Sequence, residues 1–451
     1  IGAYYTTDRN VGCATSGLGG LAGVYGIPHV YAQVTGVLTN MMSNAQYRGG
    51  AKPEPVHVLE VMVDMAARAV GIDAVELRRR NTLAPDALPF KTCMGDHFDC
   101  GDFTGNLEDA LSAAGYDDLD KRRDEAKARG RLLGIGTSNS ITGVANTNFE
   151  HVEIRFDASG GVTLLSGAMD HGQGHGTTFK QVLSHKLGVD PGNVTYRYGD
   201  TDKVAHGVGT FNARVAVFVS AAIVEAADKI VKKGSRIAAH LLEAADSDIE
   251  FVDGTFTVAG TDRTISLEDV ARAAFVKPKL PADMEPGLYE HGQFGASPGE
   301  GSTFPNGVHV AEIEIDEDTG TVELVRYTAV DDAGTILNPL LFDGQIHGGI
   351  VQGVGQILME DVNYDRESGQ LVSASFMDYC MPRAADFCDF NIAAKEIPTA
   401  RNPLGVKGVG ESGTVGAMPA VMNAVNDALT GAGAPTVEMP ATAEKVWRAL
   451  N

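Results

Sequence analysis

The residue with the clearest chemical potential is Glu411, the one acidic residue in the glycine-dense stretch Gly405–Gly413, GVKGVGESG. The next sixteen residues, TVGAMPAVMNAVNDAL, carry apolar side chains at helical spacing. A loop that exposes backbone N–H groups and then opens a helix can bind an anionic ligand. Because a carboxylate there would repel phosphate, we interpret Glu411 as a catalytic base that meets the reactive end of the ligand.

A second glycine-rich stretch, Asp170–Gly176, reads DHGQGHG. Its histidines, His171 and His175, have the i, i+4 spacing of a helical zinc site, but the glycines disfavour a helix and no third ligand lies nearby in the sequence. A backbone cradle for a phosphate or a heterocycle, with Gln173 as donor and acceptor, is the favoured interpretation. A plain turn remains the alternative.

Gly408, Gly410 and Gly413 match the GxGxxG dinucleotide pattern. A Rossmann site also requires a preceding apolar strand and an acidic residue about 20 positions later. Here Ala400–Leu404 (ARNPL) precedes the glycines, and Asp427 falls inside the expected helix. The context therefore disfavours a flavin or nicotinamide dehydrogenase.

Two further segments combine glycines with polar side chains. Gln345, Gln352 and Gln356 stand among five glycines in an expected helix near 343–359, where a flat ligand or simply a neighbouring helix could approach closely. Arg48 precedes Gly49, where it could contact a phosphate or a pterin, although a lone arginine is more often in a surface ion pair. Four such segments together favour a large, phosphate-bearing cofactor.

Composition limits the function classes. A chain of 451 residues can hold two or more domains, and its net charge of −23 argues against nucleic acid or an anionic membrane as partner. The apolar run Val215–Ala227 is too short to span a bilayer. The five cysteines form no CxxC pair, which favours reduced thiols in the cytoplasm and no metal or iron–sulfur site in this chain. The start without Met predicts a fragment or one part of a split subunit.

Several elements follow from periodicity and capping residues. The pattern predicts an amphipathic helix over 54–69 with Val58, Val61, Met62 and Met65 on one face, closed by Gly71, and then a short helix with Asp73 as N-cap. Residues 107–130 are expected to be helical and solvent-facing, with a domain edge near Gly130. Beyond it, two similar hairpins, at 151–165 and 309–324, each lead into a glycine-rich loop and a helix, while 277–305 is expected to be a long loop.

The residues quoted so far resemble the molybdenum hydroxylases of the xanthine dehydrogenase and aldehyde oxidase type. The resemblance rests on four motifs that occur in the order of that family over nearly the whole chain: Tyr47–Glu54 (YRGGAKPE), Gly172–His175 (GQGH), Asp343–Gly349 (DGQIHGG) and Gly408–Gly413 (GVGESG). It implies an α+β, two-lobed molybdopterin-binding fold with mixed sheets and glycine-rich cofactor loops. Residues 1–130 would belong to the first lobe, whose N-terminal portion is missing here, and 131–451 would form the second.

The resemblance also implies roles for individual residues. Glu411 matches the catalytic glutamate, and Arg48 with Gly49 matches a loop near the metal. Cofactor contacts are implied for the residues Gln173, Gly174, His175, Gly176, Gln345, Gly408 and Gly410. Arg214 and Ser220 fall in a segment that usually supplies phosphate contacts, although Ala213 and Val215 stand where hydroxylated residues are common. No side chain is expected to ligate the metal.

The implied enzyme inserts water-derived oxygen into an electron-poor carbon of an N-heterocycle or an aldehyde. The cofactor is expected to be molybdopterin, in its cytosine dinucleotide form, with [2Fe-2S] and FAD centres on partner subunits. An N-terminal half of the molybdenum subunit is a further expected partner, in a hetero-oligomer that could itself dimerise. Carbon monoxide dehydrogenases of the family carry a copper-binding cysteine after the loop arginine, where this chain has Gly49. The main alternative is a non-catalytic scaffold subunit of the same fold.

Overall fold

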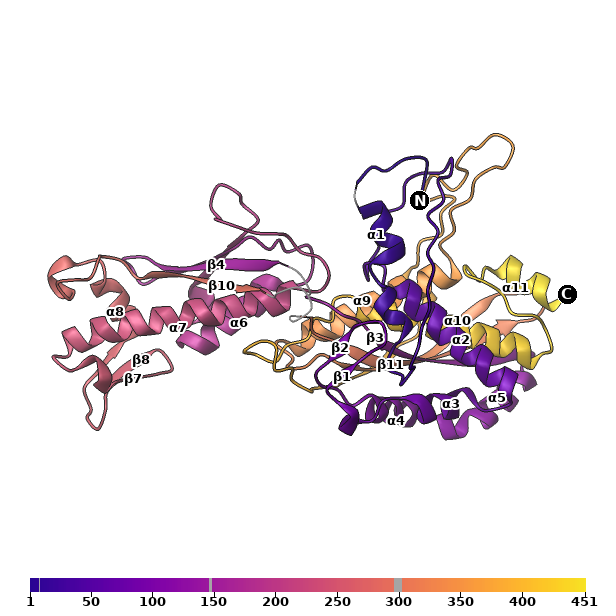
Figure 1. Ribbon diagram of the computed structural model, residues 1–451, viewed down its shortest axis with the longest axis horizontal. Coiled ribbons are helices and arrows are strands. Elements are labelled where there is room, and N and C mark those ends of the chain that lie inside the picture. The colour runs from indigo at the N-terminus through magenta and orange to yellow at the C-terminus, as the bar shows by residue number, and fades with distance from the viewer. Residues whose placement is uncertain (8, 146–147, 296–301) are drawn as a thin grey trace.

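The computed structural model describes residues 1–7, 9–145, 148–295 and 302–451 and shows two lobes joined side by side (Figure 1). The smaller lobe is built from residues 149–295. The larger lobe contains the chain before and after this segment. Its sheet joins strands from both parts of the sequence, so the two parts must fold together.

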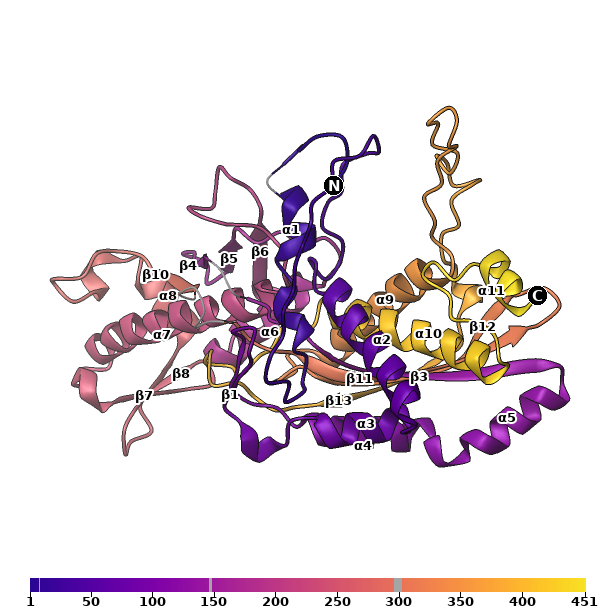
Figure 2. The same cartoon turned by 45° about the vertical axis from the view of Figure 1, so that its right-hand side comes forward.

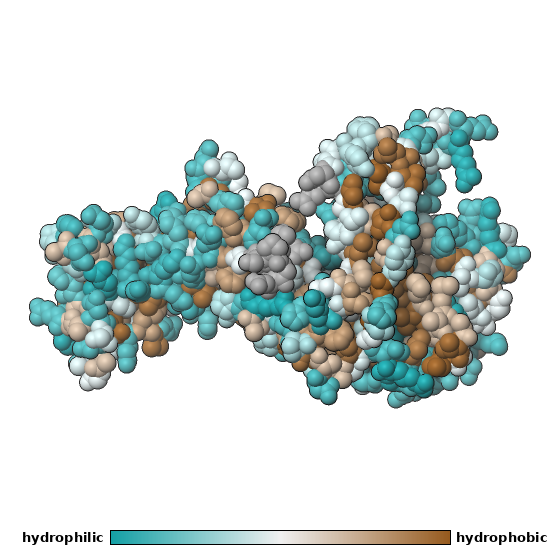
Figure 3. Space-filling view, in the orientation of Figure 1, coloured by the Kyte–Doolittle hydropathy of each residue, from teal (hydrophilic) through white to brown (hydrophobic). Residues whose placement is uncertain are grey.

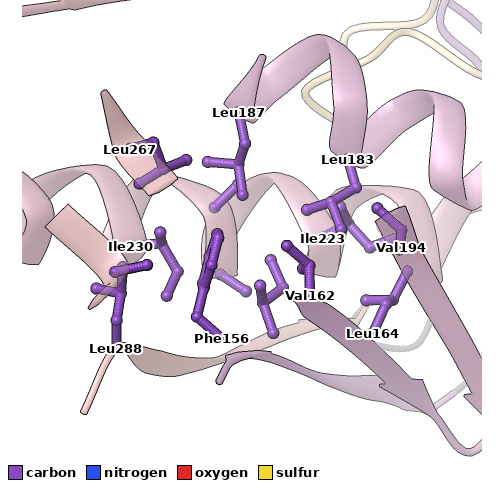
Figure 4. Close-up of a cluster of buried hydrophobic side chains, with 14 of the residues drawn as sticks. Phe156, Val162, Leu164, Leu183, Leu187, Val194, Ile223, Ile230, Leu267 and Leu288 are labelled. Carbon is purple, nitrogen blue, oxygen red and sulfur yellow. The ribbon is translucent and has the colours of Figure 1, made fainter. Parts of the chain in front are cut away.

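The smaller lobe packs two helices on one four-stranded sheet with the order β10-β4-β5-β6. Its strands are β4 (Phe149–Phe156), β5 (Val162–Ser166), β6 (Val194–Tyr198) and β10 (Tyr289–Gly295). The helices are α6 (His175–Leu187) and α7 (Val215–Leu241), whose apolar faces meet the sheet in one buried cluster (Figure 4). A small sheet of β7 (Ile249–Val252), β8 (Thr255–Val258) and β9 (Thr264–Ser266), followed by α8 (Leu267–Ala273), extends this lobe.

The larger lobe is a four-stranded sheet between two layers of helices. The order is β13-β12-β11-β3, with β3 (Arg131–Ile141), β11 (Asn306–Asp316), β12 (Val322–Asp332) and β13 (Phe390–Lys395). The helices α9 (Pro339–Leu358) and α10 (Ser412–Gly431) lie on one face, and α4 (Phe103–Ala114) and α5 (Leu119–Ala128) on the other (Figure 1). Further elements of this lobe include α1 (Arg9–Thr15), α3 (Ala74–Asn81), β1 (Phe90–Lys91), β2 (His97–Phe98) and α11 (Ala443–Leu450).

The helix α2 (Pro53–Val70) confirms the expected helix but not the orientation suggested by its apolar face. Met62 and Met65 are 60% and 55% exposed, whereas Glu60 and Asp64 point inward. Both carboxylates are paired with the buried guanidinium of Arg78, at 2.9 and 2.6 Å. The buried ion pairs therefore fix this helix to α3, and its apolar stripe is left on the surface.

The capping and strand-pairing predictions are confirmed at several positions. Gly71 has the left-handed conformation (φ 69°) that ends α2, and the Asp73 carboxylate accepts hydrogen bonds from two backbone N–H groups of α3. Both expected hairpins form, as β4–β5 and β11–β12. The helix expected after the first hairpin forms as α6, and its apolar side chains Phe179, Val182, Leu183 and Leu187 are buried in the lobe core.

Two structural expectations were wrong. The segment 277–305 is not simply a loop, because it contains the edge strand β10, which pairs with β4. Its mostly polar side chains hide the strand pattern, and its Gly292 lies against the backbone of the helix α7. The helix α4 is not solvent-facing, since Leu107 and Leu111 are buried against the sheet. The division near Gly130 remains a prediction, although α5 packs directly on β3.

The larger lobe also has surfaces that the described chain leaves uncovered. The N-terminal segment and the segment between α9 and β13 project from the same side of the lobe (Figure 2). An apolar band crosses the N-terminal segment and α2 (Figure 3), where a groove of about 960 Å³ has an apolar lining. None of the helices in the described ranges is both long and apolar enough to cross a bilayer.

Candidate active site

A cavity of about 1040 Å³ lies where the two lobes meet. The smaller lobe contributes residues of the segments 171–179 and 210–216. The larger lobe contributes 46–52, residues around α9 from 333 to 348, and the glycine loop 406–411. Segments that are far apart in the sequence therefore converge on one space, as expected for the site of a large ligand.

Basic side chains outnumber acidic ones in the described lining of this cavity, although the chain as a whole is acidic. Its described lining includes four basic side chains, Arg48, Lys52, Arg214 and Lys407, but only one carboxylate, that of Glu411. The complete chain carries a net charge of −23. Arg214 and Lys407 are paired with the buried carboxylates of Glu150 and Asp332, and Lys52 lies beside Glu411, so among these four cations Arg48 has no acidic partner within the described ranges. A surplus of positive charge in a partly enclosed cleft favours an anionic ligand.

Glu411 stands at the N-terminus of α10 and directs its carboxylate away from the helix. It occupies the N-cap position but makes no side-chain capping hydrogen bond, and the residue is only 9% exposed. Its Oε2 lies 3.4 Å from Nζ of Lys52. A partly buried carboxylate that borders a cavity without capping its own helix is well placed to act on a bound ligand.

Arg48 joins three of the elements around this carboxylate. Its Nε donates to the carbonyl of Gly410 at 2.6 Å, and its Nη2 donates to the carbonyl of Gln345 at 3.0 Å and to the Gln345 side chain at 3.2 Å. Burial lowers the pKa of Arg48, and the neighbouring Glu411 opposes that shift. The guanidinium thus fixes the residue immediately before Glu411 to the helix α9.

The helices α9 and α10 approach each other at glycines. A Cβ on Gly413 would lie 2.5 Å from the carbonyl oxygen of Ile346, and one on Gly349 would lie 2.8 Å from the Cα of Gly413. The hydroxyl of Thr414 donates to the carbonyl of Gly349 at 3.1 Å. Glycines at these positions therefore place the start of α10, and with it Glu411, against α9.

The loop before α6 is ordered by its own polar groups. Asp170 accepts hydrogen bonds from the backbone of Gly172 and Gln173, both at 3.0 Å. Burial opposes ionisation of Asp170, but these backbone bonds outweigh it and lower its pKa. The side-chain amide oxygen of Gln173 accepts a hydrogen bond from the backbone N–H of His171 at 2.7 Å. Burial lowers the pKa of His175, which favours its neutral form.

Arg214 borders the cavity but already has a protein partner. It is fully buried, forms an ion pair with Glu150, and donates to the carbonyls of Gly209 and Phe149 at 3.1 and 3.3 Å. Its guanidinium also lies 4.9 Å from the ring centre of Phe218. Arg214 therefore fixes the segment 209–214 at the junction of the lobes.

The structure brings most of the expected site residues together. Those that line the cavity are Arg48, Gln173, His175, Arg214, Gln345, Gly408, Gly410 and Glu411. Gly49, Gly174 and Gly176 lie in the same loops but outside the described lining. Ser220 lies away from it, buried in α7, where its hydroxyl donates to the carbonyls of Ala216 and Val217.

Three cavity residues were missed by the sequence analysis. Lys52 follows Arg48 by four positions, and Lys407 stands inside the GVKGVGESG stretch. A positive charge in a glycine-rich loop could have identified both lysines as candidate site residues. Lys407 donates to the buried Asp332 at 2.5 Å. Asn212 has a left-handed backbone (φ 53°) and accepts a hydrogen bond from Lys52. Nothing in the local sequence of Asn212 signals this contact between lobes.

The fold and the cavity define a cofactor-binding α+β protein, and comparisons with known proteins name its family. Models of the molybdopterin cofactor-binding domain match residues 1–82 and 109–388. The chain therefore belongs to the family of molybdopterin cofactor-binding proteins, among which the molybdenum hydroxylases resemble it in sequence and fold.

Individual relatives agree with this assignment. The chain is 34% identical to the nicotine 6-hydroxylase large subunit of Paenarthrobacter nicotinovorans, over all of this chain and 56% of that protein. It is 32% identical to the carbon monoxide dehydrogenase large chain of Afipia carboxidovorans, over 94% of this chain and 54% of that one. The crystal structure of quinoline 2-oxidoreductase from Pseudomonas putida 86 matches with a TM-score of 0.92 and 33% identity, over all of this chain and 58% of that one. The chain thus spans about half the length of these relatives.

Proposed function

We propose that this chain is the cofactor-bearing catalytic portion of a molybdenum hydroxylase. The observation that carries the proposal is the position of Glu411, the lone carboxylate in the described lining of a glycine-rich cavity between two lobes. The reaction would insert water-derived oxygen into an electron-poor carbon of a small-molecule substrate. Glu411 would act as the general base of this reaction.

The cavity residues fit a molybdopterin cofactor. Backbone at Gly408 and Gly410 and the amides of Gln173 and Gln345 offer the hydrogen-bonding groups that a pterin requires, and the guanidinium of Arg48 suits an anionic group of the cofactor. No group of three or more potential metal-ligating side chains occurs in the described ranges. We propose that the metal is held by the cofactor itself, which when bound would supply the redox chemistry and the activated oxygen.

The chain's own residues then have defined tasks. Glu411 would accept a proton at its carboxylate as the general base of the reaction. Arg48 holds the residue before Glu411 through its hydrogen bond to the Gly410 carbonyl. The close approach of α9 and α10 at their glycines fixes the backbone that follows Glu411. The burial of the carboxylate strengthens its interaction with groups in the cavity, because little water competes there.

We propose an N-heterocycle or an aldehyde as substrate. The names of nicotine 6-hydroxylase and quinoline 2-oxidoreductase indicate N-heterocyclic substrates, and both enzymes match this chain throughout its length. Carbon monoxide oxidation at a copper–molybdenum pair is disfavoured. The chain has Gly49 after Arg48, whereas a thiol would be needed there to bind copper.

The proposal includes partner chains. A polypeptide equivalent to the N-terminal half of the relatives, an iron–sulfur subunit with [2Fe-2S] and a FAD subunit would complete a cytoplasmic hetero-oligomer. The cytosine dinucleotide form of the cofactor belongs to the same proposal. Two observations support the partner chains. The chain spans only about half the length of its relatives, and in the apolar band over α2 (Figure 3) Val58, Met62 and Met65 are about half exposed or more. A surface of this kind commonly marks an interface.

The alternative is a non-catalytic scaffold subunit, and one substitution separates the two. Glu411→Gln preserves the size of the side chain but cannot accept the proton. We expect turnover of the complex to fall by at least about 100-fold, while molybdenum content stays at the wild-type level. Turnover of the variant close to that of the wild type would contradict the role of Glu411. A complex that shows no turnover even with the wild-type glutamate would favour the scaffold alternative.

A further inference from the structure

The four cations that line the cavity differ in the protein groups with which they already interact. Arg214 is paired with Glu150 and Lys407 with Asp332, inside the protein. Arg48 donates to the carbonyls of Gly410 and Gln345. Lys52 is different, because its ammonium lies beside the carboxylate that we propose as the base.

The contact between Lys52 and Glu411 is enclosed. Nζ of Lys52 lies 3.4 Å from Oε2 of Glu411, and each side chain is only 12% exposed. The same ammonium donates to Oδ1 of Asn212, on the opposite lobe. A flexible lysine held at two points in a partly buried site has a defined position, and its charge is screened less than that of a surface pair.

The two oxygens of the Glu411 carboxylate have different surroundings. Oε2 faces the ammonium of Lys52. Oε1 lies toward Gly50, where an added Cβ would be 3.8 Å away, and no hydrogen bond to this oxygen is found from the described residues, in contrast to Oε2. The carboxylate makes no capping bond to α10, and within the described ranges Lys52 is its one ion-pair partner.

We propose that Lys52 is a positioning residue for Glu411. Its ammonium holds one carboxylate oxygen and leaves the other free to accept a proton from the reacting centre. The inference rests on the proposed function for the proton-transfer step, but the pairing itself does not depend on it. Misplacing a reacting group by about 1 Å can reduce a rate by about 100-fold, which explains why a second residue would be used to hold the base.

The test compares Lys52→Met with Lys52→Arg in the complete complex. Methionine keeps the unbranched chain and removes the charge, so we expect kcat to fall about 10- to 100-fold with KM changed by less than about 3-fold, and arginine to restore most of kcat. Lys121→Met is the matched control, because it removes an exposed lysine from a 3.9 Å surface pair with Glu125 and should leave both constants unchanged.

A second readout does not use activity. The unfolding midpoints of Lys52→Met, Glu411→Gln and the double variant form a cycle. We expect the two substitutions to be non-additive, with Lys52→Met destabilising the protein less when position 411 carries no charge. This coupling, found in a complex that lacks turnover and molybdenum, would support the pairing while contradicting the proposed function.

Two results would overturn the inference. Additive midpoint shifts would show that Lys52 and Glu411 do not interact. A Lys52→Met variant with a large rise in KM and an unchanged kcat would show that Lys52 binds substrate and does not position the base.

Discussion

The contact between α9 and α10 can be tested by adding a single methyl group. In Gly413→Ala, the new Cβ would lie 2.5 Å from the carbonyl oxygen of Ile346 and 2.9 Å from both the Cα of Gly349 and the backbone nitrogen of Ile350. All three are backbone atoms, which cannot move unless α9 moves. Overpacking of this kind costs about 1–3 kcal/mol, whereas replacing glycine by alanine in a helix contributes up to about 1 kcal/mol of stability.

The net expectation for Gly413→Ala is a loss of about 1–2 kcal/mol in the free energy of unfolding. Gly431→Ala is the matched control at the other end of the same helix, because a Cβ there meets nothing within 4 Å. It should be neutral or slightly stabilising. The assay is urea unfolding of the two variants and the wild type. A Gly413→Ala variant as stable as Gly431→Ala would refute the close packing that places Glu411.

Three further predictions concern stability. Asp73→Ala removes the N-cap of α3 and should lower the free energy of unfolding by about 1 kcal/mol, as measured by urea unfolding; an unchanged value would contradict the cap. Lys407→Met leaves the buried Asp332 carboxylate without its cation and should cost about 3–5 kcal/mol, measured in the same way; a loss below about 1 kcal/mol would contradict this pair. Burial lowers the pKa of His57 from 6.5 to about 4, so the unfolded chain binds this proton more readily and stability should decrease as pH falls from 6.5 toward 4. His57→Gln should flatten that part of the stability profile, and an identical slope in the variant would argue against it.

Local signals predicted much of the secondary structure. Asp73, Gly71 and the apolar spacing in α6 and α10 act within one or two turns, so their outcome depends little on the rest of the chain. The orientation of α2 was different, because its buried face is set by a distant arginine. Glu60 and Asp64 are ordinary surface residues by sequence, and only the position of Arg78 makes their burial possible.

Part of the candidate site was also predictable from local sequence signals. Arg48, Gln173, Gln345 and Glu411 stand in glycine-rich segments, and those segments do converge on one cavity. Ser220 was chosen by its place in a family segment, and its hydroxyl instead bonds within α7. Contacts between lobes depend on the tertiary structure, as Lys52 with Asn212 shows, and no local pattern encodes them.

The most direct test of the central claim is the molybdenum content of the natively purified complex, with every co-purifying chain identified. We expect near-stoichiometric molybdenum in complexes that contain this chain, with iron and flavin on its companions. Wild-type levels of molybdenum should persist in Glu411→Gln. An intact, fully assembled complex without molybdenum would contradict the account and leave the scaffold alternative.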